Sequence, residues 1–195
     1  MGKSHDIRRQ EIVEATLDLA AEQGLKKLTT QAIAERVGIA QPTIFRHFKS
    51  RDAIFGAVIG WVAENIFRVL EQLESEQVAA DQRLRRLLQR QLAFAGRRRG
   101  IPRLLFSDRL HVESPELKAA VREIYQRIIA RIAALLQEGR TQGCFRSDLD
   151  PEQTALFIGA LMQGTILRWS MMDFGFALED EAEALWAFLW PTLRP

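Results

Sequence analysis

A glycine at position 38 separates two short helical patterns near the N-terminus, and this spacing is the strongest constraint on the fold. The first pattern begins at Thr29 or Thr30, either of which can cap a helix, and ends at Val37. The second pattern runs from about Gln41 to Phe48. Glycine readily takes the left-handed backbone conformation that ends a helix. Two short helices joined by a tight glycine turn are typical of a helix-turn-helix.

The remainder of the chain also has helical periodicity. Apolar residues recur every three or four positions, and alternating strand patterns are missing. We therefore predict an all-α fold of about nine helices, including a short one near Arg103–Leu110 and a last one over about Leu178–Leu189, before Pro191. The predicted domains are a helix-turn-helix domain at residues 1–50 and a larger helical domain at residues 51–195.

The composition argues against several classes of function. The 195 residues include one cysteine, Cys144, and three histidines, which disfavours disulfides and metal sites, and we expect no cofactor. There is no P-loop, dinucleotide fingerprint or G-x-S-x-G motif, so we do not expect an enzyme. The N-terminus lacks the apolar core of a signal peptide, and the longest uncharged run is too short for a membrane span. We expect a cytoplasmic protein without a membrane partner.

The segment "IAQPTIFRHFKS" combines apolar and basic residues in a way that suits a DNA-reading helix. Ile44 and Phe48 would hold the helix to a small core. Its N-terminal end would enter the major groove, where Gln41 can pair with adenine and the Thr43 methyl can contact thymine. Net charge supports this weakly, because residues 1–51 carry +3 and the remainder carries −1. The other candidate contacts are Pro42, beside the bases, and Arg46, His47 and Lys49, which are better placed for phosphates.

The stretch "TTQAIAERVGIAQPTIFRHFKSRDAIF", Thr29 to Phe55, resembles the N-terminal domain of TetR-family transcriptional regulators. The preceding "IVEATLDLAAEQG" resembles the first helix of that family. The resemblance implies a homodimeric, usually repressive protein that binds a pseudo-palindromic operator and is released by a small-molecule effector. It also implies base contacts by Gln41, Pro42 and Thr43, and backbone contacts by Thr30, Arg46, His47 and Lys49.

Two residues depart from the family pattern. Phe45 stands where the family often has tyrosine, so a bond from a phenol to a phosphate is unavailable. Ala40 replaces the usual Ser or Thr cap, which could cost about 1 kcal/mol of local stability. Upstream, Lys3, Arg8 and Arg9 could add phosphate or minor-groove contacts, and an untethered, solvated tail is an equal alternative.

The last two predicted helices favour dimerisation. Small residues in the first of them allow close helix approach, and two such helices per subunit can form an intersubunit four-helix bundle. An ordinary internal core is the alternative. The candidate interface residues are Leu156, Gly159, Ala160, Gln163, Leu167, Trp186, Leu189 and Trp190.

A ligand pocket in the larger domain is a further expectation. Its candidate lining is Trp61, Phe67, Phe94, Phe106, His111, Tyr125 and Trp169. Plain core packing is the alternative role of each. Two other functions stay open: a DNA-binding protein whose larger domain binds a protein partner instead of a ligand, and a helical-bundle enzyme. An open apolar groove would favour the protein partner, and convergent titratable groups would favour the enzyme.

Overall fold

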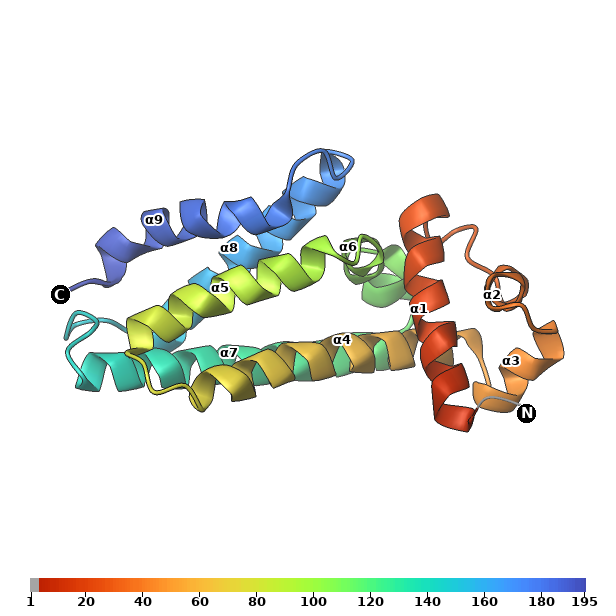
Figure 1. The fold of residues 1–195 in the computed structure, drawn as a ribbon, viewed down its shortest axis with the longest axis horizontal. Helices are drawn as coiled ribbons and strands as arrows, with labels where there is room; N and C mark the ends of the chain where they lie inside the picture. The colour runs from red at the N-terminus through yellow and green to blue at the C-terminus, as the bar shows by residue number, and fades with distance from the viewer. Residues whose placement is uncertain (1–3) are drawn as a thin grey trace. The chain divides into compact units, whose positions relative to one another are not determined.

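The computed structural model describes residues 4–195, which are helical with no β-strand (Figure 1). The predicted all-α architecture is confirmed, and the described residues form nine α-helices. The helices are α1 (His5–Gln23), α2 (Thr30–Val37), α3 (Gln41–His47), α4 (Arg51–Glu74), α5 (Ala80–Gly96), α6 (Gly100–Leu105), α7 (Pro115–Thr141), α8 (Pro151–Met171) and α9 (Glu181–Leu193). A π-helical turn, Arg109–Glu113, precedes α7, and a 3₁₀ turn, Leu178–Asp180, precedes α9.

The chain forms two compact units that do not follow the order of the sequence. The first unit holds the residues up to Glu64 together with Arg98–Val121, and the second holds Asn65–Arg97 and Arg122–Pro195. Helices α4 and α7 therefore each contribute residues to both units. The predicted domain boundary after residue 50 stays a prediction.

The first unit is organised around α1, which contacts α2, α3 and α6 (Figure 1). Its core includes the fully buried side chains of Ile12, Ile33, Ile44 and Phe55, one from each of the first four helices. Helix α6 lies so close to α1 that a Cβ atom on Gly100 would stand 2.1 Å from the carbonyl oxygen of Leu17. Glycine at position 100 is what permits this approach.

Local capping explains where the short helices begin and end. The Thr29 hydroxyl accepts a hydrogen bond from the Ala32 N–H, 3.1 Å away, at the start of α2. Gly38 takes the left-handed conformation, with φ of 73°, at its end. The Ser50 hydroxyl accepts from the Ala53 N–H at the start of α4. Thr29 and Gly38 fix the ends of α2, Ser50 fixes the start of α4, and the predicted glycine turn is confirmed.

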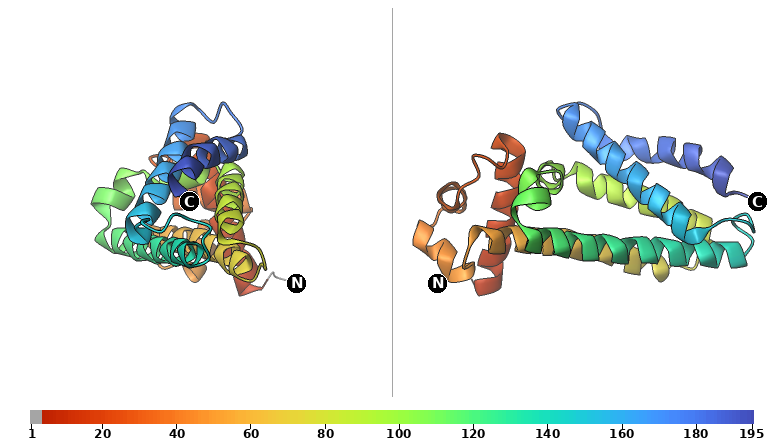
Figure 2. Two further views of the ribbon diagram at one scale, coloured as in Figure 1. Left: turned by 90° about the vertical axis from the view of Figure 1, so that its left-hand side faces the viewer. Right: turned by 180° about the vertical axis from the view of Figure 1, so that it is seen from behind.

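The second unit is a bundle in which α5 packs against α8 and α9. The second half of α4 lies beside α7 in both views (Figures 1 and 2), joined by an Arg131–Glu74 ion pair. A further ion pair connects Arg83 of α5, which is buried, with Glu138 of α7. The buried core consists mainly of leucine and isoleucine side chains, including Leu84, Leu88, Leu136 and Ile158. This unit buries enough apolar surface to form a core of its own.

Two predicted helices were placed wrongly. The short helix starts at Gly100 instead of Arg103, because Pro102 falls in its first turn, where a missing N–H is tolerated. The last helix continues to Leu193 with Pro191 inside it. Burial of the Leu193 side chain holds this final turn, as does the Leu193 carbonyl, which accepts from the Arg146 N–H at 2.9 Å.

Helix α4 is the one helix of residues 4–195 that is long and apolar enough, by length and composition, to cross a membrane. The same helix supplies Ile54, Phe55 and Val58 to the protein core. An apolar helix that packs inside a globular fold passes the same test, so its composition does not indicate a membrane protein.

Candidate DNA-binding site and helical-domain surfaces

Helix α3 begins without a side-chain cap. Ala40 occupies the N-cap position in an extended conformation and makes no side-chain hydrogen bond. Its carbonyl oxygen accepts from the Thr43 N–H at 2.8 Å, and Pro42 lies in the first turn with its φ angle already suited to a helix. The predicted missing cap is confirmed, and Pro42 favours the start of the helix in its place.

Helix α3 has one buried and one exposed side. The side chains of Ile44 and Phe48 are buried in the core of the first unit, as predicted. Pro42, Phe45 and Arg46 are exposed on the other side. The buried pair holds the helix, and the exposed side is free to meet a nucleic acid surface.

The structure brings two predicted DNA contacts together. The Gln41 side-chain Nε2 donates a hydrogen bond to the Thr30 hydroxyl oxygen, 2.8 Å away. Thr30 is the first residue of α2 and Gln41 is the first residue of α3. Both side chains are half-buried. Spacing in the sequence gave no signal for this bond, because it joins residues on different helices.

Helix α1 holds the other end of α3 through Arg9. The Arg9 Nη1 donates to the His47 carbonyl oxygen at 2.6 Å, and the guanidinium carbon lies 4.1 Å from the centroid of the Phe48 ring. Arg8 forms an ion pair with Glu11 at 2.8 Å. We therefore assign Arg9 to holding α3 instead of to a solvated tail. Lys3 lies outside the described residues.

The surroundings of His47 disfavour the charged form of its imidazole. Burial lowers the pKa of its imidazole below the ordinary value of 6.5, and the neighbouring His5, Arg46, Arg8 and Arg9 lower it further. The His5 and His47 ring centroids are 4.7 Å apart, and the buried His47 Nδ1 has no hydrogen-bond partner among the described residues. Among the predicted phosphate contacts, Arg46 and Lys49 are exposed cations, and His47 is half-buried.

Two interactions brace α2 and α4 in the first unit. Arg36 of α2 forms a two-pronged ion pair with Glu22 of α1, in which Nη1 and Oε1 are 3.0 Å apart. Arg51 at the start of α4 donates from Nη2 to the Leu25 carbonyl oxygen at 2.8 Å. Both partners of the first pair are solvated, so it contributes more to geometry than to stability.

The predicted pocket residues are divided between the two units. Trp61, Phe106 and His111 belong to the first unit; the Arg98 guanidinium carbon lies 5.5 Å from the Trp61 ring centroid, and His111 Nε2 is hydrogen-bonded to the Leu105 carbonyl oxygen at 2.8 Å. Trp169 is buried in the second unit and its indole N–H donates to the Phe176 carbonyl oxygen at 2.8 Å. Trp169 is therefore a packing residue. The predicted lining residues that belong to the second unit are Phe67, Phe94, Tyr125 and Trp169.

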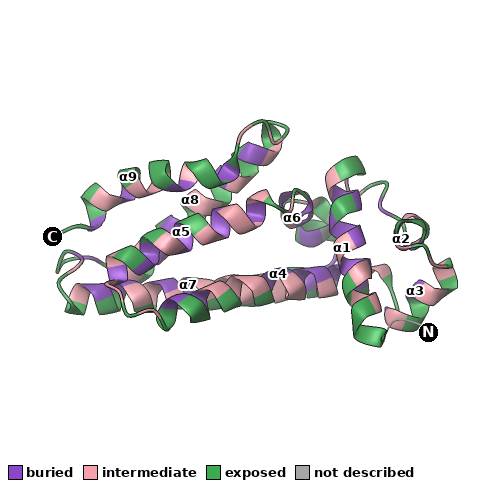
Figure 3. Cartoon of the chain, in the orientation of Figure 1, coloured by how far each residue is buried: buried purple, intermediate pink, exposed green. Residues whose placement is uncertain are grey.

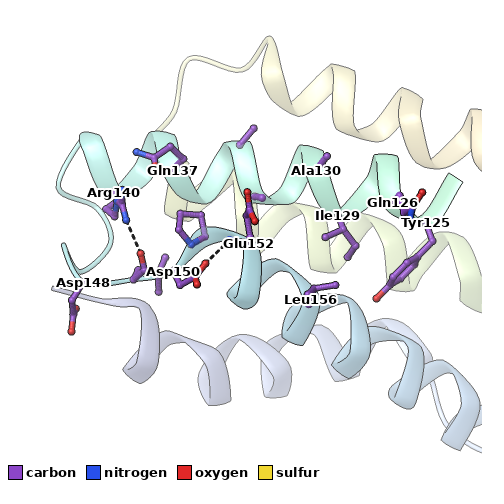
Figure 4. Close-up of a pocket in the computed structure, with 14 residues that line it drawn as sticks. Tyr125, Gln126, Ile129, Ala130, Gln137, Arg140, Asp148, Asp150, Glu152 and Leu156 are labelled. Carbon is purple, nitrogen blue, oxygen red and sulfur yellow. Dashed lines mark hydrogen bonds between the residues drawn. The ribbon is translucent and has the colours of Figure 1, made fainter. Parts of the chain in front are cut away.

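An open groove of about 940 Å³ lies between α7 and the start of α8 in the second unit (Figure 4). Ile129, Ala130 and Leu156 give it an apolar lining, and Tyr125 closes one end. Burial raises the pKa of the Tyr125 phenol, so the hydroxyl keeps its proton at neutral pH. The polar lining residues at the other end are Arg140, Asp148, Asp150 and Glu152.

The polar end of the groove is mostly committed to the fold. Arg140 donates to the Leu149 carbonyl oxygen at 2.8 Å, and Asp148 is paired with Arg146. Asp150 caps α8 by accepting from the Glu152 and Gln153 N–H groups, which confirms the predicted start of that helix. Among the described residues, no group of three or more His, Cys, Asp or Glu side chains could hold a metal ion.

The predicted dimer residues do not all face outward. Gly159 is buried against α7, where a Cβ atom would stand 2.7 Å from Ile129 Cδ1, and Leu189 is only 5% exposed in the core. Their assignment to an interface was wrong, because the small residue at 159 admits α7 of the same chain. Trp186 and Trp190 are half-buried and stack with ring centroids 5.2 Å apart. Leu156, Ala160, Gln163 and Leu167 are exposed.

Much of α8 and α9 is exposed (Figure 3), and the exposed residues include large apolar side chains that were not among the predicted site residues. Phe157 is 60% exposed, Phe188 is 66% exposed and Met171 is 72% exposed. Phe157 and Phe188 both line a groove of about 710 Å³ between the two helices. Helical periodicity alone does not show which side of α8 is buried. The sequence therefore could not show that Phe157 is exposed while Ile158 and Gly159 are buried.

Comparison with known proteins places these features in a family. Residues 12–58 match the family described as bacterial regulatory proteins, tetR family, and residues 80–185 match the tetracyclin repressor-like C-terminal domain. The second match alone covers more than half of the chain. The nucleoid occlusion factor SlmA of Aliivibrio fischeri (strain MJ11) is 26% identical over 183 residues, which is 93% of each chain.

Solved structures share the fold at low sequence identity. A putative transcriptional regulator from Saccharomonospora viridis in complex with choline has a TM-score of 0.82 and 24% identity, covering 96% of this chain and 98% of its own. The transcriptional regulator FadR from Bacillus subtilis in complex with stearoyl-CoA has a TM-score of 0.81 and 20% identity, covering 94% and 98%. These neighbours carry different ligands on a similar fold.

Proposed function

The chain belongs to the tetR family of bacterial regulatory proteins, and from this premise we propose that it represses transcription as a homodimer on a pseudo-palindromic operator. Family membership makes it a DNA-binding transcriptional regulator and not an enzyme. Repression, dimerisation and release by a small molecule are the proposed part. A regulator of this kind works where the chromosome is, in the bacterial cytoplasm.

The exposed side of α3 is the single observation that carries the proposal. Ile44 and Phe48 hold the helix in the core, and Arg9 holds its C-terminal end. Pro42 and the half-buried Gln41 and Thr43 are then presented at the N-terminal end, which suits entry into the major groove. Arg46 and Lys49 supply cations for the flanking phosphates.

The dimer is supported by the exposed apolar residues of α8 and α9. Phe157 and Phe188 line one groove between the two helices, and Leu156, Leu167 and Met171 are also exposed on α8. Large exposed apolar side chains of this kind favour an interaction surface. A two-fold dimer uses the same patch on both subunits, so one set of residues is sufficient for both sides. Two copies of the reading helix then require two half-sites separated by about a turn of DNA or more.

Release by an effector requires a ligand that binds the form without DNA more tightly. We place the effector site in the larger helical part of the chain, and the complexes of two structural neighbours with choline and with stearoyl-CoA support a small molecule as the effector. The groove between α7 and α8 is one accessible site, with an apolar lining and a protonated tyrosine hydroxyl at one end. The same groove supports an alternative function, because its openness would also admit a segment of a partner protein.

One experiment tests the regulator and separates these alternatives. Genomic fragments bound by the purified chain should contain a pseudo-palindrome, and fluorescence anisotropy then measures affinity for that fragment. A dialysable fraction of host lysate should release the DNA if the effector is a small molecule. Release by the non-dialysable fraction alone would favour the protein partner. If no sequence is enriched among bound fragments, the proposed function is wrong.

A variant tests whether the α7–α8 groove takes part. Ala130 is exposed and lines the groove, so Ala130→Trp fills it without entering the core. If the effector enters here, the variant should bind the operator as the wild type does and no longer respond to the active fraction. An unchanged response would exclude this groove and leave the rest of the helical domain as the site.

A further inference from the structure

The hydrogen bond between Thr30 and Gln41 joins the start of α2 to the start of α3. The Gln41 Nε2 is the donor and the Thr30 Oγ1 is the acceptor, at 2.8 Å. Both side chains are half-buried. The partner of this amide therefore comes from another helix, α2.

The chemistry of the amide explains why its orientation matters. A glutamine amide carries two N–H donors on nitrogen and one carbonyl acceptor. The last side-chain torsion of glutamine has a broad, roughly two-fold distribution, so an unrestrained amide exchanges the positions of these groups freely. If the N–H given to Thr30 is the one trans to the carbonyl oxygen, Gln41 keeps its other N–H and its carbonyl oxygen side by side.

We propose that Thr30 is a positioning residue that gives Gln41 its preference for adenine, an inference that rests on the proposed DNA-binding function. Adenine presents an acceptor at N7 and a donor at N6 in the major groove, which matches the remaining N–H and carbonyl of Gln41. Guanine presents acceptors at both N7 and O6, so its O6 would meet the Gln41 carbonyl oxygen without a hydrogen between them. The fixed amide therefore favours adenine over guanine at one position of each half-site.

In this proposal Thr30 orients the Gln41 amide in addition to making the predicted phosphate contact. Its hydroxyl accepts from Gln41, and that bond does not use the hydroxyl proton, which can be donated to a phosphate oxygen. A simple phosphate contact affects all DNA sequences alike, whereas a positioning residue changes the choice of base. The two roles are therefore separable by measuring base preference and overall affinity on the same variants.

The test compares Thr30→Val with Thr30→Ser in the full chain. Valine keeps the shape and removes the hydroxyl, and serine keeps the hydroxyl. Each protein is incubated with a library of double-stranded oligonucleotides with randomised positions, and the bound fraction is sequenced. The Gln41→Ala variant identifies the position that Gln41 reads as the one where adenine enrichment is lost. At that position the ratio of adenine to guanine should fall at least about fivefold in Thr30→Val, and stay as in the wild type in Thr30→Ser.

Two outcomes would overturn the inference. One is that Thr30→Val binds all duplexes more weakly while adenine enrichment at the Gln41 position is unchanged. The other is that Thr30→Val shifts base preference equally when Gln41 is already alanine, because the effect then bypasses Gln41. Circular dichroism confirms folding, and Thr30→Ala, which only removes atoms, replaces the valine variant if that one unfolds. Failure of the proposed function looks different, because the wild type would then enrich no sequence.

Discussion

Arg9 of α1 and His47 of α3 are joined by a hydrogen bond of 2.6 Å, from the Arg9 Nη1 to the His47 carbonyl oxygen. This bond satisfies a carbonyl at the C-terminal end of the short α3 helix, where carbonyls lack partners within the helix. The same guanidinium lies over the Phe48 ring. Arg9, which the sequence left as either a DNA contact or part of a solvated tail, therefore stabilises helix α3.

Replacing Arg9 should weaken both the fold and DNA binding. Arg9→Ala removes a charged hydrogen bond and a cation–π contact, so we expect a loss of about 1–3 kcal/mol in the free energy of unfolding. Urea unfolding measures this change. Arg8→Ala is the matched control, since Arg8 pairs only locally with Glu11 as far as the described contacts show. Equal effects of the two substitutions would contradict the assignment.

The His47 pKa predicts how stability responds to pH. The pKa of His47 in the folded chain is lowered, first by burial and then by His5 and three arginines. The unfolded chain therefore binds a proton at higher pH than the folded chain does. The stabilising contribution is complete above the unfolded pKa of about 6.5 and is lost as pH falls through and below it.

The matching measurement is urea unfolding of the wild type and of His47→Gln across pH 5 to 8. The stability of the wild type should decline below about pH 6.5 more steeply than that of the variant, because only the wild type carries this depressed group. Parallel pH profiles would contradict the prediction.

Lys49 should contribute to DNA affinity without regard to sequence. Its side chain is exposed next to α3, where a phosphate contact releases about one counterion. In Lys49→Ala we expect weaker binding to operator and random duplexes alike, and a salt slope smaller by about one unit. Lys118→Ala, also exposed but on α7, serves as the control. A selective loss on the operator alone would instead make Lys49 a base-reading residue.

Gly100 should tolerate no side chain. A Cβ atom there would stand 2.1 Å from the Leu17 carbonyl oxygen and 2.8 Å from its carbon, and backbone atoms cannot move aside cheaply. Gly100→Ala should destabilise the chain by about 1–3 kcal/mol. Gly60→Ala is the control, because no atom lies within 4 Å of the added methyl and alanine favours the α4 helix. The two thermal melts should shift in opposite directions.

The dimer proposal predicts a monomeric variant. Phe188 is exposed on α9, so Phe188→Glu places a charge in the proposed interface without disturbing the core. Light scattering at micromolar concentration should report a dimer for the wild type and for Gln72→Glu, an exposed change on α4, and a monomer for Phe188→Glu. A wild type that stays monomeric at this concentration would refute the dimer itself.

The sequence alone determined those features that depend on neighbours along the chain. Thr29 and Gly38 define the ends of α2, and Asp150 with Pro151 defines the start of α8, because caps and breakers act within a few residues. The family motif could also be read from the sequence, since its residues are contiguous. The fold class followed from helical periodicity.

The tertiary structure decided what depends on distant residues. Periodicity shows that α8 has two sides, but only packing against α7 reveals that Gly159 faces inward and Phe157 outward. The bonds from Gln41 to Thr30 and from Arg9 to His47 cross between helices, so no local pattern encodes them. Such pairings depend on how the helices pack, because the chain brings these side chains together only after its apolar surfaces have been buried.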